Sequence, residues 1–361
     1  MSNRNLIGKG FVFFAALVGA TFALAATAGA QSPRGGNRTG ATAAAAPTQP
    51  SQSAAAQSAI LASLPASDAV LVVDTRRLLT EGLPRAFNNN AAELARVNAE
   101  IDEFKQKYGL NARDFERVAV GTSFGQTASG ATTLDAVAVM QGRFDTGALV
   151  GAARAAAGGK YRQEQRGGKT IHVFDLSAQP RVKLFGLFNL RLTELAVAPL
   201  DANTLALGKL SRVRAAIDAA AGRGRLSNEI ASLATRTPGA MIGVGGNVPA
   251  SATRGLDLMS AEISSSVASI RQFYGSVATT QSGFRMQTVL RTETAGAART
   301  LGDTIAGLKQ FAPFVISRMP EPRAGLLRGV VEATNVTAEG SEVRIDLALA
   351  QDAMAALIDA F

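Results

Sequence analysis

Short apolar runs joined by glycine-rich turns recur along this chain and constrain its fold more than any other feature. The run Ala69–Asp74 is apolar almost throughout, which is typical of a strand buried within a sheet. Turns at Gly167-Gly168 and at Glu339-Gly340 each separate two such runs and predict hairpins. Segments with apolar residues three or four positions apart lie between the runs and predict helices. The chain is therefore expected to form mostly antiparallel sheet with packed helices, an α+β fold.

The order of the predicted elements occurs twice. Residues 59–237 and residues 238–361 both give strand, helix, hairpin, helix, hairpin and helix. Gly168–Val173 aligns with Gly340–Ile345 in this repeat. We predict two similar α+β units, each with helices on one face of its sheet, of split-βαβ or ferredoxin-like type. The pattern leaves open whether the two sheets are separate or continuous.

Individual elements follow from the same signals. We expect strands at 69–74, 117–121, 134–144, 161–165, 170–176, 194–200, 204–207, 240–244, 269–279, 284–292, 332–336 and 342–349. We expect helices from Thr75, at 90–108, from a cap at Asp145 to Gly158-Gly159, and at 211–221, 255–264, 294–311 and 351–361.

The first 30 residues have the pattern of an export signal. Arg4 and Lys9 precede an uncharged apolar stretch from Phe11 to Ala30, which ends in the A-x-A-like site Ala28-Gly29-Ala30. Cleavage there would release the protein into the periplasm or the medium. The alternative is an uncleaved inner-membrane anchor formed by residues 11–30, because twenty apolar residues can cross a bilayer. Residues 31–58 are rich in Ala, Ser, Gln and Pro and predict a disordered tether.

Composition excludes several classes of protein. The 361 residues include no cysteine and one histidine, which excludes disulfides, thiol catalysis and a metal site built from several histidines. The formal charge of +9 arises from 37 basic and 28 acidic residues. Four of the basic residues lie before the first acid, Asp68, so the rest of the chain carries +5. Because basic runs and interleaved aromatic residues are missing from the sequence, nucleic acid is not an expected partner.

Two stretches resemble a loose group of exported bacterial proteins that carry a domain of unknown function. The first is Leu64-Pro65 followed by Asp68-Ala69-Val70 and Val73-Asp74. The second is Asn203–Gly208 before the helical segment Val213–Asp218. The resemblance implies export and a structural role for these motifs, and it brings no catalytic residues with it.

One motif suggests a serine hydrolase. Gly121-Thr122-Ser123-Phe124-Gly125 has the G-x-S-x-G pattern of a nucleophile elbow and follows a predicted strand. An elbow needs a helix next, whereas residues 126–131 are typical of a hairpin loop, so we interpret the motif as part of a turn. The base could only be His172, with Asp135 or Asp145 as the acid. His172 alternates with apolar neighbours, so we expect it on the opposite face of its strand from them.

Nucleotide motifs are incomplete, so no cofactor is predicted. Gly168-Lys169-Thr170 resembles the end of a P-loop, but Gln163 occupies the position of its first glycine. Gly243-Val244-Gly245-Gly246 lacks the last glycine of the dinucleotide fingerprint. No acidic cluster has the spacing of a calcium loop, and no metal site is predicted.

The segment 181–192 is the most unusual in composition because it combines apolar and basic residues. We interpret it as a docking segment for another envelope protein or an anionic membrane surface. The alternative is a strand pair that covers the core of the first unit. The residues concerned are Val182, Lys183, Leu184, Phe185, Leu187, Phe188 and Arg191.

The sequence thus predicts a non-catalytic envelope protein that binds or scaffolds, through this segment or through a groove between the two units. A serine hydrolase that uses Ser123 and a purely structural envelope component are the two alternatives.

Overall fold

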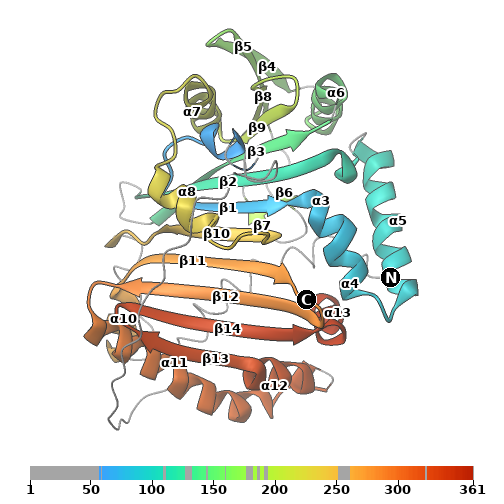
Figure 1. Cartoon of the computed structure of the whole chain (residues 1–361). Helices are drawn as coiled ribbons and strands as arrows, with labels where there is room; N and C mark the ends of the chain where they lie inside the picture. The colour runs from blue at the N-terminus through green and yellow to red at the C-terminus, as the bar shows by residue number, and fades with distance from the viewer. Residues whose placement is uncertain are drawn as a thin grey trace, which may run out of the picture.

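The chain forms one large antiparallel sheet with helices around it (Figure 1). The computed structural model describes residues 57–360, except 58, 109–110, 127–131, 144, 159, 176–181, 185–187, 191–193, 251–260 and 322. The sheet has twelve strands, and a separate two-stranded ribbon pairs β6 (Val182–Leu184) with β7 (Phe188–Leu190). The order across the large sheet is β13 (Thr334–Glu339), β14 (Glu342–Ala350), β12 (Gly283–Thr292), β11 (Ile270–Thr279), β10 (Ile242–Asn247), β1 (Ala69–Asp74), β2 (Phe115–Gln126), β3 (Thr132–Gly142), β9 (Thr204–Gly208), β8 (Glu194–Pro199), β5 (Lys169–Asp175) and β4 (Tyr161–Arg166).

The sheet is continuous across the middle of the chain. The first strands of the two expected units, β1 and β10, pair with each other along Ala69 to Val73. We call residues 59–237 the N-terminal half and residues 238–360 the C-terminal half. The α+β class and the antiparallel strand pairing predicted from the sequence are confirmed.

The C-terminal half contains a split βαβ arrangement. Both β12 and β13 are antiparallel to β14, so they run parallel to each other with β14 between them. The connection from β12 to β13 passes through two helices. In the N-terminal half, β9 lies between β3 and β8 in the same way.

Most of the helices lie where the sequence predicts them. Two were missed, α8 and α12, because the first is short and the second carries two glycines. The described helical elements are α3 (Thr75–Arg77), η2 (Leu78–Gly82), α4 (Leu83–Ala86), α5 (Ala91–Tyr108), η3 (Ala112–Asp114), α6 (Thr146–Ala156), α7 (Leu210–Ala220), α8 (Asn228–Ala234), α10 (Ala261–Ala268), α11 (Ala295–Ile316), α12 (Arg323–Ala333) and α13 (Gln351–Ala360). Of the helix predicted at 255–264, residues 255–260 lie outside the described part.

Helices cover the N-terminal half on both faces of the sheet. On β1, Val70 and Val72 pack with α7 and α8 on what we call the first face, whereas Leu71 and Val73 point to the second face. That second face carries α4 and α5, and α6 packs on it beside Phe174 of β5. The prediction of helices on one face is therefore wrong for this half. Because successive residues of β1 are apolar, apolar side chains point to both faces of the sheet, and both faces must be covered.

The described helices that follow β10 lie on the second face, whereas α8 covers β10 and β11 on the first face. The side chains of Val343, Ile345, Leu347 and Leu349 alternate with polar ones along β14 and contact the cores under α10, α11 and α13. The intervening residues of β14, among them Arg344 and Asp346, point to the first face, where they are exposed or half-buried. β14 thus keeps the apolar-in, polar-out alternation of a strand whose sheet faces water on one side.

Glycines in β10 let α8 approach the middle of the sheet closely. A Cβ atom added to Gly243 would lie 1.9 Å from the carbonyl oxygen of Ala234, and one at Gly245 would lie 2.5 Å from Leu233 Cβ. No side chain fits at either distance. The Gly-x-Gly pattern of this strand therefore serves helix packing rather than dinucleotide binding.

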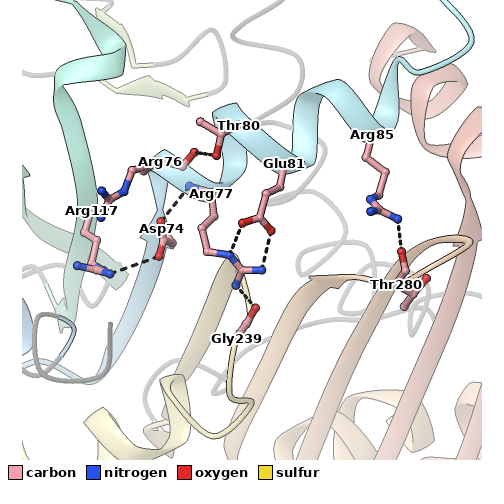
Figure 2. A network of polar contacts seen from close by, with 9 residues as sticks. All are labelled: Asp74, Arg76, Arg77, Thr80, Glu81, Arg85, Arg117, Gly239 and Thr280. Carbon is pink, nitrogen blue, oxygen red and sulfur yellow. Dashed lines mark hydrogen bonds and ion pairs between the residues drawn. The ribbon is translucent and has the colours of Figure 1, made fainter. Parts of the chain in front are cut away.

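Polar contacts fasten the helical segment after β1 to the C-terminal half (Figure 2). Arg77 binds Glu81 and the carbonyl oxygen of Gly239, and Arg85 binds the carbonyl oxygen of Thr280. The hydrogen bond from Arg77 lowers the pKa of Glu81 below its usual range. Beneath them, the core around Phe87 joins apolar residues of both halves, including Met241 and Phe284. The two halves therefore share one core.

Candidate functional site

The G-x-S-x-G motif lies inside a strand and not at a turn. Ser123 belongs to β2 and is paired with Asp135 of β3, so the turn interpretation of this motif is wrong. A Cβ at Gly121 would lie 2.6 Å from Ser67 Oγ, which explains the first glycine of the motif. The Phe124 amide donates to Asp68 Oδ2 over 2.8 Å. The motif therefore holds the loop 65–68, which joins the helical residues 59–62 to β1.

The motif around Leu64 and Asp68 lies where the chain enters the sheet. Leu64 is fully buried, and Arg212 of α7 donates to Ala66 O and to Ser67 Oγ over 3.0 and 2.7 Å. Burial lowers the pKa of Arg212 below its usual range. These contacts hold the chain against α7 where it enters the sheet.

The structure does not bring Ser123 and His172 together. Their strands, β2 and β5, are four positions apart in the sheet, which is roughly 19 Å at the usual strand spacing. They also point to opposite faces, because Ser123 has the parity of buried Ala119 on the first face, while His172 lies opposite to Ile171 and Val173. The predicted orientation of His172 is confirmed. The hydrolase alternative thus loses its nucleophile–base pair.

His172 takes part in an aromatic cluster on the edge hairpin. Its Nδ1 atom lies 2.6 Å from the hydroxyl oxygen of Tyr161, and the two rings are stacked. The guanidinium of Arg154 lies 5.0 Å from the centre of the Tyr161 ring. Burial lowers the pKa of His172 below its usual range, which favours the neutral ring as acceptor of the Tyr161 hydroxyl proton.

An open depression of about 460 Å³ lies at the ends of β4, β5 and β8. Charged residues of both signs line it, including Lys160, Arg162, Asp175 and Glu194. Arg162 and Glu194 face each other at 3.7 Å. No group of three or more potential metal ligands occurs among the described residues.

The predicted docking segment is described only in part. Val182, Lys183 and Leu184 form β6, and Phe188 belongs to β7, so this part of the segment has the strand pairing that the covering alternative expected. Phe185, Leu187 and Arg191 lie outside the described residues, as does the exposure of every side chain in 181–192. The docking hypothesis for this segment stays a prediction.

Among the described residues, large exposed apolar side chains gather at the end of α11. Phe311, Phe314 and Val315 are 49 %, 61 % and 44 % exposed, and Met319 just beyond the helix is 40 % exposed. The guanidinium of Arg318 lies 4.3 Å from the centre of the Phe314 ring. We call these five residues the α11 surface. The sequence pattern did not reveal it because the predicted helix ended at Phe311.

The α11 surface lies on the outer side of the helix, opposite its buried face. Leu301, Leu308 and Ala312 of the inner face pack into the protein, and Ala312 contacts α12 through a small cluster of its own. Earlier in the helix the outward positions hold Thr300 and Asp303, as a solvated face should. Apolar residues occupy the outward positions only in the last two turns. This contrast within one helix makes the end of α11 a candidate binding surface.

The helix continues past Phe311 despite Pro313. Proline cannot donate a backbone hydrogen bond, but its carbonyl oxygen accepts one from the Ser317 amide over 2.9 Å. The spacing of Phe311, Phe314 and Val315, three and four residues apart, was the signal that could have shown a continuing helix.

No protein-family model and no curated protein sequence matches this chain. Three crystal forms of TP0453 have similar structures, with TM-scores of 0.42, 0.41 and 0.40 and sequence identities of 9 %, 9 % and 10 %. The similarity covers 83 %, 83 % and 82 % of this chain and 96 %, 98 % and 95 % of those chains. No described helix is long and apolar enough to cross a membrane.

Proposed function

We propose that this protein is a non-catalytic binding protein that docks through the α11 surface. The observation that carries the proposal is the exposure of Phe311 and Phe314 on the outer side of a helix whose earlier outward positions are polar. Exposed apolar clusters of this kind mark interaction sites on soluble domains. The separation of Ser123 from His172 supports a non-catalytic role over the serine hydrolase alternative.

The proposed docking site is a surface and not a groove between the halves. The junction of the halves is a pair of hydrogen-bonded strands, β1 and β10, with α8 against it on the first face. The segment 75–86 covers it on the second face. The expected partner is another envelope protein or an anionic membrane surface.

The proposed setting is the cell envelope. The basic start, the apolar stretch 11–30 and the small residues at 28–30 support export to the periplasm or the medium. Sequencing the N-terminus of the mature protein tests this proposal, because cleavage predicts Gln31 as the first residue. A mature protein that retains residues 11–30 would support the anchored alternative.

We also propose that the two halves are versions of one unit. In both halves a strand and a first hairpin are followed by a helical connection and a second hairpin. The last strand of the second hairpin pairs with the last strand of the first hairpin, β9 with β3 and β14 with β12. This makes β9 the counterpart of β14, although the helices that follow these strands, α7 and α13, lie on opposite faces of the sheet. In this proposal the hairpin β4–β5 has no counterpart in the C-terminal half. The alignment predicted from the sequence instead matched β5 with β14.

Photo-crosslinking in cells that produce the protein tests the docking proposal. A photoreactive amino acid replaces Phe314 in one variant and Thr300, on the same outer side, in the matched control. We expect adducts from position 314, with protein or lipid, and none above background from position 300. Equal yields from the two positions would contradict the proposal.

A further inference from the structure

We propose that the partner of the α11 surface is an anionic lipid membrane. This inference rests on the docking function proposed above and names the chemistry of its partner. The surface lies at one end of the molecule, where α11 and α12 form the lower boundary in Figure 1. An end-on position lets the exposed side chains meet a flat bilayer without contact by the rest of the protein.

The extent of the α11 surface favours a membrane over a folded protein. Four side chains that are about half exposed present on the order of 400 Å² of apolar surface. A stable protein interface buries about 800 Å² on each partner. A membrane interface needs less, because single aromatic and aliphatic side chains can enter the boundary between head groups and acyl chains.

The charges around the surface match anionic head groups. Between residues 309 and 328 the sequence has four basic residues, Lys309, Arg318, Arg323 and Arg328, and one acid, Glu321. Arg328 binds Glu321 over 2.7 Å, and Lys309 binds the carbonyl oxygen of Thr334. Arg318 instead lies over Phe314, so its charge stands beside the residue that would enter the lipid. Aromatic residues and arginine side by side are typical of interfacial helices.

Because the chain contains no cysteine, a single introduced cysteine can be labelled at one chosen position. We would label the full-length variant Ser317→Cys with an environment-sensitive fluorophore, which keeps both phenylalanines in place. The matched variant Thr300→Cys carries the same label on the outer side of the same helix. Vesicles contain either phosphatidylcholine alone or a 7:3 mixture with phosphatidylglycerol. Because the signal is local, attachment through residues 11–30 does not register unless α11 also meets the bilayer.

With anionic vesicles we expect the emission of the label at position 317 to shift to the blue and spin-labelled lipids to quench its fluorescence. The emission of the label at position 300 should not shift. Replacing both Phe311 and Phe314 by serine should weaken this response at least tenfold, since the loss of buried apolar area dominates. Arg318→Glu should weaken it by about fivefold or more, and added salt should reduce it. Arg299→Glu is the control, with the same change of charge at the other end of the helix. The exposed substitutions should leave the melting temperature unchanged.

A label at position 317 that stays in water with both kinds of vesicle would overturn the lipid inference. If the photoreactive amino acid at position 314 then forms protein adducts in cells, the docking function stands and its partner is a protein. If position 314 also yields no adducts, both proposals fail. A shift that depends on protein concentration without vesicles would identify a second copy of the chain as the occupant and overturn the inference as well.

Discussion

The N-terminal half of the sheet is covered on both faces, whereas the described helices of the C-terminal half lie on one face. The difference begins in the strands. β1 is apolar at positions of both parities, but β14 alternates buried apolar residues with Arg344 and Asp346. The first half thus closes around its strands. In the second half α8 covers the first face of β10 and β11, and β14 leaves that face to water. The apolar exposure at α11 belongs to this more open half.

The difference between the halves depends first on α8, which closes the first face over the middle of the sheet. We expect Gly243→Val to cause the largest loss of stability, roughly 3 kcal/mol or more, because its side chain would collide with the backbone of α8. Urea denaturation measures the loss. Gly307→Ala is the control, since a Cβ there meets nothing within 4 Å. Equal stabilities of the two variants would show that α8 does not pack as described.

The shared core predicts that the halves unfold together. Phe87 is 1 % exposed in a cluster built from both halves, so Phe87→Ala should cost about 3–5 kcal/mol. Hydrogen exchange followed by mass spectrometry should show the loss of protection in both β1–β2 and β12–β14. Loss confined to the N-terminal half would mean that the halves are separate folding units.

The arginine contacts across the junction should have a smaller effect. Arg85 donates to backbone oxygens of Thr280 and Gln281 in the other half, and Arg85→Ala should cost about 1 kcal/mol. Arg96, which pairs with Glu93 on its own helix, is a matched exposed control with an expected cost of about 0.3 kcal/mol. Thermal unfolding of the two variants checks the order. A larger loss from Arg96→Ala would argue against fastening by Arg85.

The smallest expected effect is the pH dependence from His172. Its pKa in the folded protein lies below that of the unfolded chain, so the unfolded chain binds the proton more tightly. The contribution to stability is present above the unfolded pKa near ~6.5 and is lost as the pH falls from there through the lower pKa of the folded protein. Stability measured at pH 7.5 and at pH 5 should fall more in the wild type than in His172→Gln. An equal fall would show that Tyr161 and its neighbours do not favour the neutral ring.

The sequence was a good guide wherever structure is local. Hairpins at Gly167-Gly168 and Gly340 are specified by glycines with positive φ and adjacent β-rich runs, and they were predicted correctly. The pairing of β1 with β10 joins segments that are more than 160 residues apart, and no local pattern encodes it. For the same reason the sequence pattern aligned β5 with β14, whereas the proposed relation between the halves pairs β9 with β14.

The candidate site was predicted less well than the fold. Composition pointed to 181–192, whose side chains lie outside the described residues, and the exposed surface at α11 went unnoticed. A helix that passes Pro313 breaks the usual local rule, and exposure depends on which helix face the rest of the protein covers. In the sequence, Phe311 and Phe314 look like core residues. Only the fold shows that α12 and the sheet cover the opposite face of α11.

Photo-crosslinking in living cells that compares position 314 with position 185 tests the central claim most directly, because each position represents one candidate docking surface. We predict that a reactive group in place of Phe314 gives one dominant adduct, and that the group in place of Phe185 gives none. Adducts from position 185 together with silence at position 314 would contradict docking through α11 and assign it to the N-terminal half.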